Sequence, residues 1–240
     1  MSVVVVDEAR FAVTAADAVQ SRLPSTRPRL GVATGGTPER VYAELVRRSR
    51  AGQLDLADAT IVALDEYVGL SGDDPRSYAT YVRDLIAGPL GVPPDNVLTA
   101  DGAAPDPDCE AVRLDAAIAA MGGVDVQILG LGGNGHIGFN EPGSALDSPS
   151  RTVTLDEQTR SDNARYFSGE IAEVPRSAIT QGLGTISRAR AIVLLAVGAH
   201  KARPLAAALH GPMTTEVPAS VLQRHPDVTV IADHAAAALL

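Results

Sequence analysis

The chain has 240 residues, of which 45% are hydrophobic and 20% charged, and this composition predicts one soluble domain over residues 1–240 with an aliphatic core. A formal net charge of −9 without a basic stripe excludes nucleic acid and an anionic membrane as expected partners, and Cys109 alone cannot form an internal disulfide or a thiolate zinc site. No apolar run reaches the roughly 20 residues of a membrane span and no signal-peptide pattern opens the chain, so we expect a cytoplasmic protein.

Strands and helices alternate through the first half of the chain. Short β-branched or apolar runs predict strands at residues 3–6, 30–33 and 59–64. Apolar residues at helical spacing predict a helix over residues 8–23 capped by Asp7, and another over residues 38–50, with Pro38 in its first turn and Thr37 as its cap. Helices are also predicted over residues 77–85 and 110–121, with a turn at 93–95 and a loop at 101–108 between them.

The second half continues the alternation. A buried strand over residues 124–131 leads into a glycine-rich loop, and further strands are predicted at residues 191–197 and 228–232. Helices are predicted over residues 160–167, near 201–209 and in the tail at 235–240. Strands that alternate with helices predict an α/β fold with a single-domain, mostly parallel, doubly wound (Rossmann-like) sheet and helices on both faces. We find no internal repeat or linker that would divide the chain.

The glycine-rich loop carries the sharpest functional signal. It reads GLGGNGHIGFNE over residues 130–141 and places Asn134, His136 and Glu141 close together. A lone histidine is more often structural, but these neighbours can orient an acid–base imidazole, so we favour a catalytic His136. A metal site made from His136, Asp65 and Glu141 is the weaker alternative because no ligand spacing supports it. We predict surface or structural roles for the other histidines, His200, His210, His225 and His234.

Two further polar clusters follow predicted strands. TGGTP at residues 34–38 opens a helix whose exposed N–H groups can bind phosphate, so Gly35, Gly36 and Thr37 form a candidate anion site. The other interpretation is a plain capped turn, because the motif lacks the lysine of a P-loop. Asp65 could be a general base supported by Glu66, or one of these two carboxylates could cap the following loop. Because ligands sit outside the carboxyl ends of parallel strands, we expect all three clusters to form one site.

Two cations could complete that site. Lys201 follows the predicted strand at residues 191–197, and Arg165 lies in the polar segment NARYF. Either residue could clamp a phosphate, although most lysines and arginines in such positions are solvated.

These motifs together resemble the glucosamine-6-phosphate deaminase family. The resemblance rests on TGGTP, LDEYVGL at residues 64–70, GLGGNGHIGFNEPGSAL at 130–146, SRT at 150–152, TRSDNARYF at 159–167 and GAHKA at 198–202. Order and spacing match over essentially the whole chain. The wider superfamily also holds 6-phosphogluconolactonases, which share the fold and a Gly-His loop but lack the FNEP continuation.

The resemblance implies a hydrolase that converts glucosamine 6-phosphate and water to fructose 6-phosphate and ammonium without a metal or organic cofactor. It implies that His136, oriented by Asn134 and Glu141, opens the pyranose ring, and that Asp65 moves a proton from C2 to C1 through an enolamine. It also implies which groups hold the phosphate of this small-molecule substrate: Gly35, Gly36, Thr37, Arg165 and Lys201.

Two departures from the family pattern matter. Many members carry aspartate where this chain has Asn134, which can orient His136 through a hydrogen bond but cannot stabilise an imidazolium by charge; shorter members resemble this chain there. The allosterically activated members have a longer C-terminus and a basic pair soon after SRT, whereas residues 153–155 read VTL here and the sequence stops at Leu240. We therefore expect no activation by N-acetylglucosamine 6-phosphate, and a monomer or small homo-oligomer rather than a hexamer.

Residues 150–173 are polar and are expected to act as a lid that excludes water during proton transfer.

Two other functions are open on the sequence. A 6-phosphogluconolactonase-type hydrolase would use the same histidine and phosphate site, and release of ammonia separates it from a deaminase. A non-catalytic sugar-phosphate-sensing domain is weakened by the acidic charge, by the lack of a DNA-binding appendage, and by the presence of both Asp65 and His136.

Overall fold

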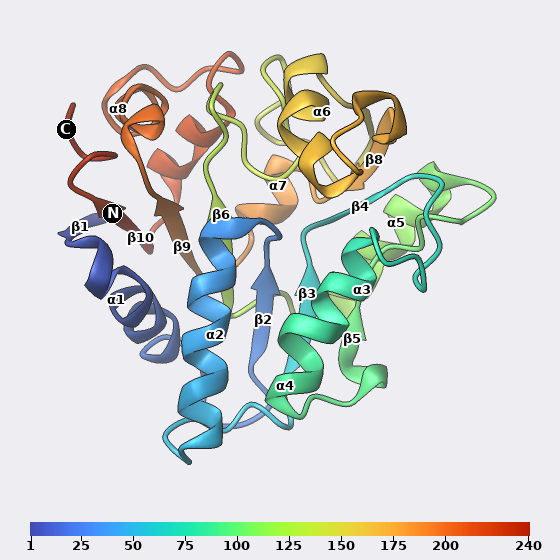
Figure 1. The fold of residues 1–240 in the computed structure, drawn as a ribbon, viewed down its shortest axis with the longest axis horizontal. Coiled ribbons are helices and arrows are strands. Elements are labelled where there is room, and N and C mark those ends of the chain that lie inside the picture. Colours follow the sequence, from blue (N-terminus) through green and yellow to red (C-terminus); the bar gives the residue numbers. More distant parts are fainter.

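Seven parallel strands form the central sheet of the computed structural model, which describes residues 1–240 (Figure 1). Their spatial order is β1-β10-β9-β6-β2-β3-β5. The strands are β1 (Ser2–Val6), β2 (Arg29–Val32), β3 (Thr60–Ala63), β5 (Val97–Leu98), β6 (Val126–Gly130), β9 (Ala191–Ala196) and β10 (Val228–Asp233). The predicted doubly wound α/β fold is confirmed.

Helices cover both faces of this sheet. One face carries α1 (Glu8–Gln20), α2 (Gly36–Arg50), α3 (Tyr78–Val82), the π-helical turn Arg83–Ala87 and α4 (Gly88–Leu90). The other carries α5 (Pro107–Ala120), α7 (Leu183–Ile186) and α8 (Ala202–His210). In β9, Ile192 and Leu194 pack on one face of the sheet, while Val193 and Leu195 pack on the other. The strand is apolar throughout because both of its faces are buried.

A second sheet of three antiparallel strands lies beyond the carboxyl end of β3. It contains β4 (Asp65–Tyr67), β8 (Ser177–Thr180) and β7 (Arg151–Thr154), in the order β4-β8-β7. Helix α6 (Glu157–Asn163) lies next to this sheet (Figure 1). A small core that includes Tyr67, Phe139 and Phe167 packs against the sheet. The sequence did not predict this sheet, because its strands are only three or four residues long and mostly polar.

Short 3₁₀ turns complete the chain, at Pro94–Asn96, Ala164–Tyr166, Ile171–Glu173, Ala199–Lys201 and Pro218–Arg224. No helix has the length and apolar character needed to cross a bilayer.

Several predicted details of the helices are wrong. Residues 235–240 form turns after β10 instead of a helix. The cap of α2 is Gly35, with φ of 110°, and not Thr37, which lies inside the first turn. Asp7 stands at the start of α1, but its side chain accepts no capping hydrogen bond. The helix predicted at residues 160–167 begins earlier, behind the capping side chain of Asp156, and its second part is a 3₁₀ turn.

The connections of the sheet leave a crevice between β2 and β6. From β2 the chain moves outward through β3 to β5, and from β6 it moves outward in the opposite direction through β9 to β10. Ligands of open α/β sheets bind outside the carboxyl ends of strands at such a switch point. The TGGTP turn follows β2 and the glycine-rich loop follows β6, so both predicted clusters lie at this position.

Candidate active site

A cavity of about 340 Å³ lies at the carboxyl ends of β2, β3 and β6. Residues predicted from three separate clusters line it together: Gly35, Gly36, Thr37, Asp65, His136, Arg165 and Lys201. Asn134 and Glu141 are not among its lining residues and instead hold His136 from behind. The structure therefore brings the predicted residues into one site.

Three side chains form a hydrogen-bonded relay behind the cavity. The amide oxygen of Asn134 lies 2.7 Å from Nδ1 of His136, and its amide nitrogen donates to Oε2 of Glu141 at 2.7 Å. Nδ1 also lies 3.2 Å from the same carboxylate oxygen. Because an amide oxygen can only accept, the proton of neutral His136 resides on Nδ1, and Nε2 is left as a proton acceptor.

The carboxylate of Glu141 is suited to supporting an imidazolium. Burial works to raise its pKa, but hydrogen bonds and charge from His136, with donors from Thr159 and Asn134, outweigh burial and leave the pKa lowered. The hydroxyl of Thr159 donates to Oε1 at 2.5 Å. Glu141 is therefore ionised near neutral pH, and it supplies the negative charge that Asn134 lacks.

The imidazole of His136 lies directly against the backbone of Gly132. A Cβ atom at this position would be 2.4 Å from Nδ1, Cε1 and Nε2 of His136. Such contacts are far shorter than van der Waals distances, so any side chain at residue 132 would displace the ring. The glycine in this turn is required by the position of the histidine.

Asp65 is a buried carboxyl group that faces the cavity from β4. It is 6% exposed, and burial, followed by the nearby charge of Glu66, raises its pKa to about 8. At pH 7 this value leaves about nine-tenths of the groups protonated. A cationic group bound next to Asp65 would lower its pKa and restore the carboxylate.

Glu66 has a different role from the support of Asp65 that the sequence suggested. Neighbouring side chains in a strand point to opposite faces, and Glu66 points away from Asp65. Its carboxylate accepts backbone N–H bonds from Tyr67, Tyr78 and Ala79 at 2.8, 3.0 and 2.8 Å. Glu66 therefore ties the end of β4 to the start of α3, whereas the sequence suggested a cap of the following loop.

The other end of the cavity is rich in donors suited to an anion. The first backbone N–H groups of α2, at Gly36 and Thr37, have no partners within the helix, and both residues line the cavity. Burial lowers the pKa of Lys201, while the charge of Asp162 opposes this shift and that of Arg165 adds to it. Lys201 is the single lysine of the chain.

Tyrosines add a lining that the sequence analysis missed. The hydroxyl of Tyr78 donates to that of Tyr67 at 3.1 Å, and Asn163 donates to the same hydroxyl at 3.0 Å. Tyr81 also lines the cavity. Three of the five tyrosines fall within residues 67–81 of a chain with 3% aromatic residues, and this concentration was a signal that could have been used.

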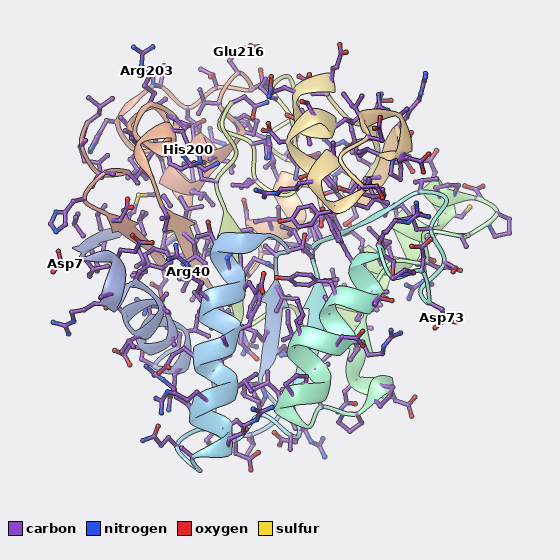
Figure 2. All side chains as sticks on the ribbon, viewed as in Figure 1. Asp7, Arg40, Asp73, His200, Arg203 and Glu216 are labelled. Carbon is purple, nitrogen blue, oxygen red and sulfur yellow. The ribbon has the colours of Figure 1, made fainter.

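The remaining histidines lie outside the site, as predicted. His225 is buried and its ring bridges the carbonyl of Ala189 and the N–H of Asp227, which is a structural role. Three are exposed, His200, His210 and His234, and Figure 2 shows His200 in the region of α8. No three His, Cys, Asp or Glu side chains form a group that could hold a metal ion.

Comparisons with known proteins agree with this geometry. Residues 6–231 match a family model described as glucosamine-6-phosphate isomerases/6-phosphogluconolactonase. A glucosamine-6-phosphate deaminase of Cutibacterium acnes is 51% identical over 98% of this chain and 90% of its own length. A protein of the same name from Streptomyces coelicolor is 47% identical over 100% of this chain and 93% of its own length.

Two solved structures show the same relationship, one at higher and one at lower sequence identity. A structure described as a monomeric glucosamine-6-phosphate deaminase is 40% identical, with a TM-score of 0.96 over 100% of both chains. A 6-phosphogluconolactonase from Trypanosoma cruzi is 21% identical, with a TM-score of 0.80 over 100% of this chain and 96% of its own, and it shares the fold. The chain therefore belongs to the family of glucosamine-6-phosphate isomerases and 6-phosphogluconolactonases.

Proposed function

We propose that this protein is a glucosamine-6-phosphate deaminase, a hydrolase that converts glucosamine 6-phosphate and water to fructose 6-phosphate and ammonium. The observation that carries the proposal is the pairing of two acid–base groups on one cavity. His136, held by Asn134 and Glu141, and the buried Asp65 both face the cavity. The same cavity is lined by N–H groups and cations that can bind an anion. The close relatives named as deaminases support the same reaction.

In this mechanism His136 opens the sugar ring. Its free Nε2 takes the proton of the anomeric hydroxyl, and the imidazolium returns a proton to the ring oxygen as the C1–O5 bond breaks. Asn134 fixes the tautomer that leaves Nε2 free, and the ionised Glu141 stabilises the imidazolium. The product of this step is the open-chain amino aldehyde.

Asp65 then carries out the isomerisation. The substrate ammonium group lies next to C2, and its positive charge lowers the pKa of Asp65 from about 8, so the carboxylate becomes available as a base. As the C2–H bond breaks, its electron pair forms the C1–C2 double bond, the C1–O1 double bond becomes a single bond, and O1 takes a proton from the substrate ammonium group, which leaves a neutral amine on C2. Asp65 returns its proton to C1, a ketimine forms at C2, and addition of water with loss of ammonia yields fructose 6-phosphate.

The phosphate is held at the other end of the cavity in this proposal. It would be bound by the N–H groups of Gly36 and Thr37, by the turn at Gly35 and by the cations Arg165 and Lys201, all of which line the cavity. A helix N-terminus favours negative charge, so this local arrangement can bind a phosphorylated sugar against the net charge of −9.

Three further features belong to the same proposal. We expect a monomer, because a relative of 40% identity is described as monomeric. We place the enzyme in the cytoplasm, where phosphorylated sugars are retained because they do not cross a bilayer unaided. We also propose that residues 150–173 act as a lid, since Thr159, Asn163 and Arg165 from this segment line the cavity.

The experiment that tests the proposal compares two substrates. We expect the purified protein to release ammonium from glucosamine 6-phosphate in the presence of EDTA, and to leave 6-phosphogluconolactone hydrolysis at the uncatalysed rate. Lactone hydrolysis without ammonium would replace the proposal with the lactonase reaction. Tight binding of either sugar phosphate without turnover would favour the sensing domain instead.

A further inference from the structure

Helix α6 presents two polar side chains one turn apart to the interior of the site. Thr159 is 5% exposed, and Asn163 is half-buried four residues later on the same helix. Residues at this spacing share one face of a helix. Both side chains line the cavity, and they donate hydrogen bonds to Glu141 and to Tyr67, respectively.

The two oxygens of the Glu141 carboxylate have different partners, and Thr159 bonds to only one of them. Oε1 accepts from the Thr159 hydroxyl at 2.5 Å, while Oε2 accepts from Asn134 and lies 3.2 Å from Nδ1 of His136. The hydroxyl fixes the rotation of the carboxylate so that Oε2 faces the relay. Without this donor, Oε1 would stay in a largely buried position with its hydrogen bond unmade, which disfavours the ionised form.

Asn163 donates to Tyr67, which lies on the same strand as Asp65. The hydroxyl oxygen of Tyr67 accepts from Asn163 at 3.0 Å and from Tyr78 at 3.1 Å, so the phenolic proton of Tyr67 is left to point elsewhere. Tyr67 and Asp65 are two residues apart on β4 and share its face toward the cavity. Burial, followed among other causes by the charge of Asp65, raises the pKa of Tyr67, as expected for a phenol held near this carboxylate.

We propose that Thr159 and Asn163 are positioning residues, and that α6 couples the two acid–base groups by holding Glu141 and Tyr67 from a single helical face. This inference rests on the proposed function for its kinetic consequences. Thr159 serves ring opening through Glu141 and His136, and Asn163 serves the C2–C1 proton transfer through Tyr67 and Asp65. Docking of α6 therefore completes both halves of the reaction together.

The Thr159 contact is tested by Thr159→Val, which keeps the β-branched shape and removes the hydroxyl. We expect kcat to fall about ten- to a hundredfold with little change in KM, as for other supporting hydrogen bonds, and the acidic limb of the kcat profile to move to higher pH. Thr159→Ser restores the hydroxyl and should restore both quantities. Ser161→Ala removes an exposed hydroxyl from the same helix and should change neither.

A carbon-13 NMR titration of Glu141 tests the same contact without turnover. Its pKa should rise in Thr159→Val and stay at the wild-type value in Thr159→Ser and Ser161→Ala. An unchanged pKa in Thr159→Val would overturn the inference, whether or not the enzyme is a deaminase. A raised pKa in a protein that releases no ammonium would keep the contact and reject the proposed function.

The separate roles of Thr159 in ring opening and Asn163 in proton transfer are tested with glucosamine 6-phosphate deuterated at C2. Thr159→Val should slow ring opening, so the deuterium isotope effect on kcat/KM should fall toward one. Asn163→Leu should slow proton transfer, so its isotope effect should equal or exceed that of the wild type. The same isotope effect in both variants, with activity lost in proportion to thermal stability, would show a packing role and contradict the proposal.

Discussion

At the scale of single residues, the protonation of Asp65 is the feature on which the mechanism depends most. Its pKa of about 8 comes first from burial, and the protein gives it no hydrogen bond that would hold it ionised. A carboxyl group in this condition gains its base form when a cation binds beside it. In the proposed mechanism the amino group of the substrate is such a cation, so its charge would both identify the substrate and activate the base.

Asp65→Asn is therefore expected to reduce kcat by at least about a hundredfold, because the variant cannot take or return the proton. The measurement is ammonium release under saturating substrate. Glu66→Gln is the matched control: it weakens three backbone hydrogen bonds and should lower the free energy of unfolding by about 1–3 kcal/mol, while kcat changes less. Near-normal turnover in Asp65→Asn would contradict the assigned role.

The same variant predicts a pH dependence of stability. Folded Asp65 binds its proton up to about pH 8, whereas the unfolded group releases it near 3.9, so this residue destabilises the fold progressively as pH rises from about 4 to about 8. Asp65→Asn should consequently gain stability over the wild type through this window, with the difference constant above it. Urea unfolding at pH 5, 7 and 9 measures this; a constant difference across the three values would contradict the raised pKa.

Gly132 gives a test of the histidine position. A Cβ atom there would meet the His136 ring at 2.4 Å, so Gly132→Ala should displace the imidazole and lower kcat by about a hundredfold, as expected for misplacement of a catalytic group by about 1 Å. Gly133→Ala is the control, because a Cβ at residue 133 meets nothing within 4 Å. Equal kcat values for the two variants would show that the ring does not need its present position.

At the scale of elements, the lid proposal concerns the segment that contains β7 and α6. If substrate draws this segment onto the cavity, fructose 6-phosphate should slow trypsin cleavage after Arg160 and Arg165. Cleavage after Arg50, an exposed residue at the end of α2, should be unaffected and serves as the control. Equal cleavage rates after Arg160 and Arg165 with and without ligand would contradict a lid.

The sequence predicted long apolar elements well and short polar ones poorly. Strand β9 has six buried residues and could hardly be anything but an interior strand, and α2 shows a clear apolar face. Strands β4, β7 and β8 gain their pairing only from one another, so no local pattern reveals them. The tail at residues 235–240 was predicted to be helical, but it forms turns that follow Asp233, whose side chain accepts from the N–H of Ala236.

The candidate site was predictable to a similar degree. His136, Asp65 and the TGGTP turn were visible because each breaks an apolar pattern with glycine or charge. The contacts of Thr159 and Asn163 were not, because they depend on how α6 packs over the second sheet. The function of Glu66 was left between two alternatives for the same reason, since its partners lie 12 and 13 residues away.

At the scale of the whole molecule, we predict that N-acetylglucosamine 6-phosphate does not activate this enzyme. Two members of the SRT triplet have internal partners: Arg151 donates to Asn140, Ser148 and Ser144 at 2.8, 3.1 and 2.9 Å, and Ser150 bonds to Asp115. Rate curves against substrate should be hyperbolic with and without this compound. A sigmoidal curve that the compound makes hyperbolic would contradict the prediction.

Charge is organised differently at the site and over the whole surface. The net charge is −9, and Figure 2 shows acidic and basic side chains at well-separated points of the molecule, among them Asp7, Asp73 and Arg203. In the proposed phosphate site, Arg165, Lys201 and the N-terminus of α2 would oppose this field. Binding of a sugar phosphate therefore depends on a few local donors and not on long-range attraction.

The central claim is that Asp65 and His136 act in sequence on one amino-sugar phosphate. The most direct measurement is a time course of both products from glucosamine 6-phosphate in D₂O with EDTA, followed by NMR and an ammonium assay. We predict fructose 6-phosphate and ammonium in equal amounts at every time point. Any carbon-bound deuterium in the product should be found only at C1. Ammonium without fructose 6-phosphate, or neither product, would contradict the account.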